Sequence, residues 1–460
     1  MRIKLYFQAL FFSNQFTLFL IDTKLIKLKF MNQSTTLSQV KWSLFEKIGF
    51  RFSFIYFLLF IVFKNNGAYP LWSMLMKYPT DLVQMFIPWV GKNILNLQED
   101  ITTFTNGSGD TTYDYVSILV IFVFAIFGCL VWSLIDRNRD NYKKMYYWIT
   151  VAIRFYVGLM LINYGLIKIV KLQFPYPAFY RLIESYGDSS PMGLAWTFLG
   201  FSKGYNLFMG VAEVCAVLLL FRRTMTAGAI ITLMTATNVM AVNYFYDVPV
   251  KILSTHLVLM TLFLLSRDLK PLFTFFFTGR AVSLSTIKQP EKNGDKSLKL
   301  VSRILKGLLL AYVLIFGIIR LSQSQKLYGE KAPKPDLHGL FKITHFEKNG
   351  DTLSTAVDNY ERWRYLILER KGSAQIQKID KSKLYFKSEI DTLKTEIILT
   401  SYQDSTDTFI INYKKEDNKF SFETIFENDS IKARGRILKK ENFTLMNRGF
   451  NWINEYPFNK

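Results

Sequence analysis

The sequence predicts a polytopic α-helical membrane bundle followed by a C-terminal antiparallel β-barrel or sandwich. Half of the 460 residues are hydrophobic, and they occur in long runs such as Val116–Ile135, which have the length of membrane-spanning helices. The last 125 or so residues are polar instead, with short alternating segments typical of an antiparallel barrel or sandwich. The net charge of +21 is compatible with nucleic-acid binding, but the long apolar runs exclude a soluble nucleic-acid-binding protein as the first interpretation.

Seven apolar runs are candidates for membrane-spanning helices, since a span needs about 20 mostly apolar residues and shorter runs are tolerated when flanking side chains reach the interface. They are Ile48–Phe63, Val116–Ile135, Tyr147–Val170, Tyr205–Phe221, Thr224–Tyr246, Ile252–Leu265 and Ile304–Ile319. The first and the sixth are the weakest. Residues 1–30 have basic ends, an interrupted apolar middle and no small-residue cleavage site. Met31 is an equally good start, so we give residues 1–30 no structural weight.

The charges between these runs predict their orientation. If the N-terminus lies in the cytoplasm and the runs alternate, the cytoplasmic segments 1–51, 136–146, 222–223 and 267–306 carry 23 basic and 7 acidic residues. The loops on the opposite side carry 7 basic and 8 acidic residues. Because Lys and Arg accumulate in cytoplasmic loops, we expect a cytoplasmic N-terminus and a C-terminal domain on the far side of the membrane.

We therefore expect seven parts along the chain. They are a cytoplasmic segment (1–47), two spanning helices (48–146) with a long periplasmic loop (64–115), a four-helix core (147–277), a basic cytoplasmic loop (278–303), a seventh helix (304–320), a linker (321–335) and a periplasmic β-rich domain (336–460).

The long loop 64–115 has two features of its own. Its first part, Leu71–Leu97, mixes aromatic residues with two prolines, which predicts short helices on the membrane surface more than a functional lid. Its second part, Asn106–Asp114, is rich in glycine, and such loops can bind anions through successive N–H groups. Asp110 and Asp114 argue against an anion, so we favour N-capping of the helix that begins near Tyr115.

Short alternating segments predict the strands of the C-terminal domain, eight or so in all. Examples are Tyr365–Glu369, Ala374–Ile379, Lys383–Lys387, Thr395–Leu399, Thr408–Tyr413, Phe420–Phe426 and Ser430–Leu438. Turn sequences such as Lys371-Gly372 separate them.

Ten polar or charged side chains lie inside or at the ends of the expected helices, where burial is costly and each needs a reason. They are Arg154, Asn163, Lys168, Asn206, Glu213, Asn238, Asn243, Asp247, Lys251 and His256. In the expected orientation most of them lie in the outer half of the bilayer. They therefore predict one outward-facing cavity, in which Glu213 would be neutralised by Lys168.

Spacing along the third run supports this cluster. Arg154 and Lys168 are 14 residues apart, almost four turns, and so share one helix face. Gly158 and Gly165 lie near that face and would let another helix approach closely. Three interpretations of the cluster stay open: structural packing, a ligand-binding site, and a proton or redox relay.

The residues do not specify a nucleophile, a metal site or a phosphate site. Three histidines leave little room for a histidine-built metal site. Cys129 and Cys215 lie in different apolar runs, where the thiolate is disfavoured, so we expect both to be inert packing residues.

Residues 147–277 resemble the DoxX family of bacterial membrane proteins, which are four-helix membrane bundles. The resemblance rests on Arg154-Phe-Tyr-Val-Gly158, Tyr164-Gly165-Leu-Ile-Lys168, Gly210-Val-Ala-Glu213, Pro249 through His256, and Ser266-Arg-Asp268. The loop NGSGDTTYDY and the ending Arg448–Pro457 look like those of larger DoxX-like proteins. Some members belong to redox systems, as a subunit of a thiosulfate:quinone oxidoreductase or a scaffold for thiol-handling enzymes. A bacterial inner-membrane location is implied.

The C-terminal domain more weakly resembles a small lipocalin-like barrel, with Trp363 early and Trp452 late. A barrel of that size holds one small apolar ligand or is filled by its own side chains and binds only partners.

Two functional hypotheses follow. The first is a non-catalytic binding or scaffold protein for a lipid, a quinone or another apolar small molecule. The second is the membrane subunit of a quinone-linked thiol or sulfur redox complex, in which Lys168, Glu213 and His256 polarise a quinone and relay protons. Expected partners are the lipid bilayer, an apolar small molecule and a periplasmic or redox protein, with no nucleic acid; quinone is the only cofactor implied.

Overall fold

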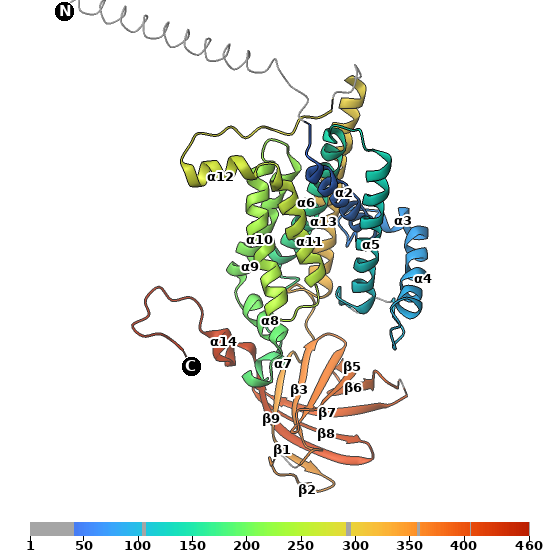
Figure 1. The fold of residues 1–460 in the computed structure, drawn as a ribbon. Helices are drawn as coiled ribbons and strands as arrows, with labels where there is room; N and C mark the ends of the chain where they lie inside the picture. The colour runs from blue at the N-terminus through green and yellow to red at the C-terminus, as the bar shows by residue number, and fades with distance from the viewer. Residues whose placement is uncertain (1–40, 104–106, 291–295, 357–358, 405, 460) are drawn as a thin grey trace, which may run out of the picture. The chain divides into compact units, whose positions relative to one another are not determined.

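The computed structural model describes residues 41–103, 107–290, 296–356, 359–404 and 406–459 (Figure 1). Most of the expected cytoplasmic segment 1–47, including the doubtful first 30 residues, lies outside these ranges. Contacts divide the chain into two compact units. The first unit contains the described part of Met1–Lys64 with Ser117–Ala152 and Lys288–Pro290, and the second contains the rest of the described chain.

Each of the seven apolar runs is helical. The corresponding helices are α2 (Leu44–Phe63), α5 (Thr112–Ile135), α6 (Lys143–Ile169), α9 (Lys203–Val214) continued by the 3₁₀ helix η2 (Cys215–Leu220), α10 (Met225–Phe245), α11 (Lys251–Ser266) and α13 (Lys296–Leu327). Shorter helices complete the helical part: α3 (Trp72–Leu75), α4 (Lys77–Asn93), α7 (Phe179–Leu182), η1 (Tyr186–Asp188), α8 (Pro191–Phe201) and α12 (Leu269–Thr278). Helices α3 and α4 lie within Leu71–Leu97, where the sequence predicted short helices.

Five of the described helical segments are long and apolar enough to cross a membrane, and a sixth is if α11 and α12, bent by 80° at their junction, count as one span. Helix α2 is not among them. Any stretch of 18 residues in α2 contains Glu46, Lys47 and Arg51, and three charges exceed what a continuous apolar span tolerates. The described chain therefore has five or six helical segments that could cross a membrane, and the count of seven spans stays a prediction.

Helical structure extends into two segments that were expected to be a loop and a linker. Helix α12 reaches the expected loop 278–303 only at Thr278, and the first turns of α13 occupy residues 296–303. At the other end, α13 continues through Leu327 into the expected linker, because Ser324 and Gln325 are buried there and the Gln325 amide donates to the carbonyl of Val170. The sequence suggested a linker because these residues are polar, and it did not show that another part of the chain buries them.

The start of the long loop also differs from a surface segment. Tyr69 packs against Leu159 and contacts the ring of Tyr156 with centroids 6.4 Å apart, and Tyr156 lies at the middle of α6. The side chain of Asn65 accepts from the Tyr69 N–H at 2.9 Å and donates to the Tyr69 carbonyl at 3.1 Å. These hydrogen bonds satisfy backbone groups of the segment that no helix or strand pairs.

The C-terminal region is a closed, eight-stranded antiparallel β-barrel. Its strands are β1 (Gly339–Lys348), β3 (Trp363–Arg370), β4 (Ser373–Lys378), β5 (Lys383–Asp391), β6 (Glu396–Ser401), β7 (Thr408–Glu416), β8 (Lys419–Phe426) and β9 (Asp429–Leu438), with the two-residue β2 (Asp351–Thr352) attached to β1. Each strand pairs with the next, and β1 pairs with β9 to close the barrel. The seven predicted segments match β3 to β9.

Strand β1 was missed, and its burial explains why. Leu340 and Phe341 are adjacent yet both buried, so the strand lacks the alternation that marks a half-exposed strand. Phe341 faces the barrel core, whereas Leu340 belongs to a cluster on the outside of the barrel with Phe179.

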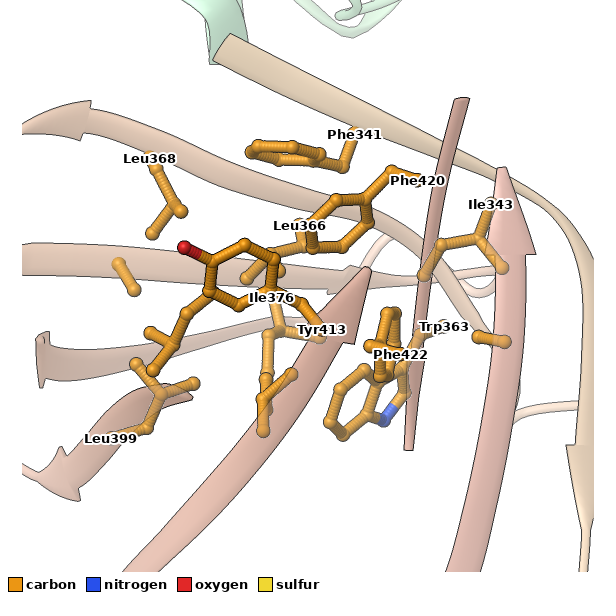
Figure 2. Close-up of a cluster of buried hydrophobic side chains, with 14 of the residues drawn as sticks. Phe341, Ile343, Trp363, Leu366, Leu368, Ile376, Leu399, Tyr413, Phe420 and Phe422 are labelled. Atoms are coloured by element: carbon orange, nitrogen blue, oxygen red, sulfur yellow. The ribbon is translucent and has the colours of Figure 1, made fainter. Parts of the chain in front are cut away.

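The barrel interior is filled by its own side chains (Figure 2). Trp363, 1% exposed, lies at the centre and contacts Phe422 and Phe426 with ring centroids 5.8 and 5.5 Å apart. The rings of Phe341 and Phe420 pack together in another part of the core, with centroids 4.3 Å apart. Of the two options that the sequence left open, the structure therefore favours a packed core over a ligand-holding lumen.

A segment before α8 binds the outside of the barrel. Phe179 is fully buried against Tyr365 and Ile367, and its N–H donates to the carboxylate of Glu369 at 2.9 Å. Lys440 lies 2.8 Å from the other oxygen of that carboxylate and donates to the carbonyl of Pro177 at 2.9 Å. This attachment combines an apolar contact with an ion pair that holds the connecting loop.

Acidification should weaken this attachment through His338, whose ring lies 5.6 Å from that of Phe179. Burial lowers the pKa of His338 below its ordinary value, and Lys334 acts in the same direction. The undocked state therefore takes up a proton first, so stability falls as the pH drops through about 6.5. We expect the thermal stability of the wild type to decrease between pH 7.5 and pH 5.5. The decrease should be smaller in His338→Gln, which cannot take up this proton. An identical pH dependence in the variant would contradict this role.

Closure of the barrel should depend on Gly435. A Cβ at this position would overlap the carbonyl oxygen of Lys342 on β1, so Gly435→Val must distort the β1–β9 seam and destabilise the barrel by about 1–3 kcal/mol. Amide hydrogen exchange should show lost protection in β1 and β9. Lys432→Val, an exposed position on the same strand, is the control; equal protection in both variants would show that the seam tolerates a side chain.

Candidate functional site

The candidate site is built on the packing of α6 against α9 and η2. A Cβ at Gly165 would lie 2.6 Å from the carbonyl oxygen of Gly210, and a Cβ at Gly210 would lie 2.6 Å from that of Gly165. Gly158 is equally tight against Leu220, at 2.7 Å. The close helix approach predicted at Gly158 and Gly165 is confirmed, and it brings two backbones together where any larger residue would separate them.

One turn beyond this contact, Lys168 and Glu213 form an ion pair. The Lys168 ammonium donates to both carboxylate oxygens of Glu213 at 2.7 Å, and the two residues are 5% and 3% exposed. Glu213 lies ten residues after Lys203 and seven before Leu220, near the middle of the span Lys203–Leu220. The pairing expected from the sequence is therefore present in the structure, deep inside a membrane-compatible helix.

Aromatic rings surround the ammonium of the pair. Lys168 Nζ lies 5.7 Å from the ring centre of Tyr164 and 5.8 Å from that of Phe174, and Phe174 packs on Trp196. Rings at this distance attract a cation through their π faces. They also keep water away, which strengthens the Coulomb attraction and raises the cost of losing either partner.

Asn206 lies on the same face of α9 as Glu213, two turns earlier. Its amide nitrogen donates to the carbonyls of Leu199 at 2.6 Å and Ser202 at 3.0 Å. Its side-chain oxygen is buried and has no hydrogen-bond donor among the described residues. A buried acceptor of this kind is costly unless a ligand or a water donates to it.

Arg154 lies at the opposite end of the contact between α6 and η2, which we call the α6–η2 seam. Its Nε donates to the carbonyl of Leu219 at 2.5 Å, and it is 2% exposed. The 14 residues that separate it from Lys168 correspond to about 21 Å along α6. Arg154 therefore shares a helix face with Lys168, as expected, but belongs to a different environment.

The turn between α10 and α11 collects three of the predicted residues. Asn243 donates to the carbonyl of Val250 at 3.3 Å, and Lys251 forms an ion pair with Asp247 at 2.9 Å. Asp110, from the glycine-rich loop, accepts from the backbone N–H groups of Lys251 and Ile252 at 2.7 and 3.0 Å.

Asp110 thus caps a helix 141 residues away in the sequence. The prediction that Asp110 caps the helix beginning near Tyr115 was wrong, because the loop folds back onto α11. Asp114 does cap α5, but from inside its first turn: its carboxylate accepts from the N–H of Thr111 at 3.0 Å, and its own N–H donates to the Thr111 hydroxyl at 3.3 Å.

The remaining predicted residues do not join the ion pair. Asn238 is exposed and lies on the same face of α10 as Met234 and Phe245, which are 71% and 82% exposed, so this face points away from the bundle. His256 is buried, and its Nδ1 is hydrogen-bonded to the carbonyl of Ile252 in its own helix at 2.6 Å. Asn163 is half-buried. The outward cavity with all ten residues remains a prediction.

The sequence reasoning missed a polar cluster in the first unit. Arg51 is 2% exposed and donates to the hydroxyl of Tyr142 at 2.9 Å, to Ser133 at 2.9 Å and to the carbonyl of Asp136 at 2.7 Å. Trp132 and Phe50 pack on the Tyr142 ring with centroids 5.3 Å away. An arginine within a mostly apolar run was the available signal, but Arg51 was counted as part of the cytoplasmic segment.

Metal binding and cysteine pairing are not supported by the described residues. They contain no group of three or more His, Cys, Asp or Glu side chains placed to hold a metal ion. Cys129 and Cys215 are both free thiols.

Breaking the ion pair on one side should cost far more than replacing both partners. Glu213→Gln would leave the Lys168 ammonium buried without a counter-charge, and we expect a loss of about 3–5 kcal/mol. The double variant Lys168→Met/Glu213→Leu should recover most of that loss. Thermal unfolding of the purified protein in detergent measures both. A double variant as unstable as the single variant would show that the pair is not the dominant interaction.

Comparison with known proteins gives one informative relative. No protein-family model and no solved structure matches the chain. The uncharacterized protein YwoB of Bacillus subtilis (strain 168) is 33% identical over 150 residues, which are 30% of this chain and 88% of YwoB. Because the match extends over nearly all of that protein, the chain belongs to the same family as YwoB.

Proposed function

We propose that the protein is a non-catalytic binding protein and scaffold of a bacterial inner membrane. Its DoxX-like helical core binds an apolar small molecule with a polar head, such as a lipid or a quinone, beside Lys168, Glu213 and Asn206. The N-terminus lies in the cytoplasm, and the barrel lies in the periplasm, where it binds a protein partner.

The observation that carries the proposal is the buried, self-neutralised ion pair. Both carboxylate oxygens of Glu213 accept from one ammonium, so each charge is neutralised by the other. A pair of this kind can orient a ligand by its dipole without reacting. The unmatched oxygen of Asn206 adds an acceptor two turns away, which suits a ligand that carries a hydroxyl group on an apolar body.

The packed barrel supports the scaffold part of the proposal. A barrel core filled by Trp363 and its neighbours leaves the outer surface as the place for recognition. The charge distribution of the sequence supports the orientation, because basic residues concentrate in the segments assigned to the cytoplasm. The alternative, a membrane subunit of a quinone-linked redox complex, depends on His256, whose Nδ1 is hydrogen-bonded to the carbonyl of Ile252 in its own helix.

Mass spectrometry of gently purified protein tests the ligand. We expect wild type to retain an apolar molecule that is lost by about tenfold or more from Lys168→Met/Glu213→Leu, as removal of a charged hydrogen-bonding group costs about 1.5–3 kcal/mol. Asn238→Ala, on the exposed face of α10, should retain the molecule fully.

Two results would overturn the proposal. One is the absence of any apolar molecule enriched over an unrelated membrane protein purified in the same way. The other is equal retention by wild type and by a folded double variant, whose folding is checked by circular dichroism.

A further inference from the structure

A second polar cluster lies at the far end of the α6–η2 seam. Lys306, on α13, donates through its ammonium to the carbonyl of Leu220, the last residue of η2. The same ammonium lies 4.2 Å from the ring centre of Phe221 and 5.7 Å from that of Phe155. Three elements of the second unit therefore meet at this ammonium.

Two further positive charges lie near Lys306. They belong to Arg154, which bonds the neighbouring carbonyl of Leu219, and to Arg222, which is exposed directly after η2. Lys168 is paired with a carboxylate at the other end of the α6–η2 contact, whereas Lys306 donates to the neutral carbonyl oxygen of Leu220. The positive charges of Lys306 and Arg222 repel one another, and an anion bound beside them would lower their energy.

An apolar groove begins next to this cluster. It has a volume of about 510 Å³. Its lining includes Pro70 and, from α13, Leu305, Leu308, Leu309, Tyr312 and Phe316. Leu305 precedes Lys306 in the chain. Leu309, one turn later, also packs in the cluster that contains Leu220 and Phe155, the residues that Lys306 touches.

The groove thus runs along α13 away from a positively charged end. From Leu305 to Phe316 it spans 12 residues of α13, or about 17 Å along the helix axis. An apolar path of this length that starts at a group of Lys and Arg side chains matches a phospholipid: a phosphate at the charged end and an acyl chain along the groove. A free phosphate would use the charges but leave the groove empty.

We propose that Lys306 and Arg222, with Arg154 behind them, bind the phosphate of an anionic phospholipid whose acyl chain occupies the α13 groove. The site is separate from the ligand proposed beside Glu213 and does not depend on it. Lys306 then has two roles, since it closes the carbonyl end of η2 and attracts the headgroup.

Native mass spectrometry from lipid nanodiscs tests this site. The full-length protein is placed in nanodiscs that contain phosphatidylglycerol and phosphatidylcholine in equal amounts, and the lipids retained after release are counted. We expect wild type to retain phosphatidylglycerol preferentially. Lys306→Gln/Arg222→Gln should reduce that preference by about fivefold for each charge removed. Lys270→Gln/Arg280→Gln removes two exposed charges elsewhere and should leave the preference unchanged.

Two further variants separate the charges from the groove. Lys306→Arg/Arg222→Lys keeps both charges and should keep the preference. Ala311→Trp fills the groove and should reduce retention of the lipid with every charge intact. Equal retention of both lipids by wild type would overturn the proposal. So would an equal loss in the Lys270/Arg280 control, or a normal preference in folded Lys306→Gln/Arg222→Gln, which would leave Lys306 as a helix cap only.

Discussion

The contact between Gly165 and Gly210 is the constraint on which the helical core depends. Two backbones meet there at a distance that no side chain permits, and the charged residues Lys168 and Glu213 each follow their glycine by three positions. The close approach therefore places the ammonium against the carboxylate, and the ion pair in turn penalises any shift of one helix along the other. Packing and electrostatics specify the same register, which neither would hold alone in a lipid environment.

The helices and the ion pair could be predicted because their signals are local. Apolar runs mark α5, α6, α10 and α13, and a Lys and a Glu in two such runs have few other ways to be neutralised. Asp110 could not be assigned in this way. Its carboxylate is typical of a cap, but which helix it caps depends on a loop that folds back onto a segment 141 residues away.

Other features depend on exposure and burial that polarity alone does not reveal. Asn238 is polar and lies in an apolar run, but only the packing of α10 shows that its side chain is exposed. Gln325 looked like part of a linker, but a neighbouring carbonyl makes it part of α13. Strand β1 was missed because Leu340 is covered from outside the barrel by Phe179. Each case required knowledge of a distant segment.

The β1–β9 seam also bears on how the barrel is made. Its first and last strands are partners, so the sheet has two open edges until Leu438 has been synthesised, and open edges invite pairing with other chains. Closure joins residues almost a hundred positions apart, which makes it slow compared with hairpin formation. The 32-residue helix α13 ends shortly before β1 and holds one end of the unfinished sheet. The order of synthesis thus places a helix that could cross a membrane before the segment most exposed to aggregation.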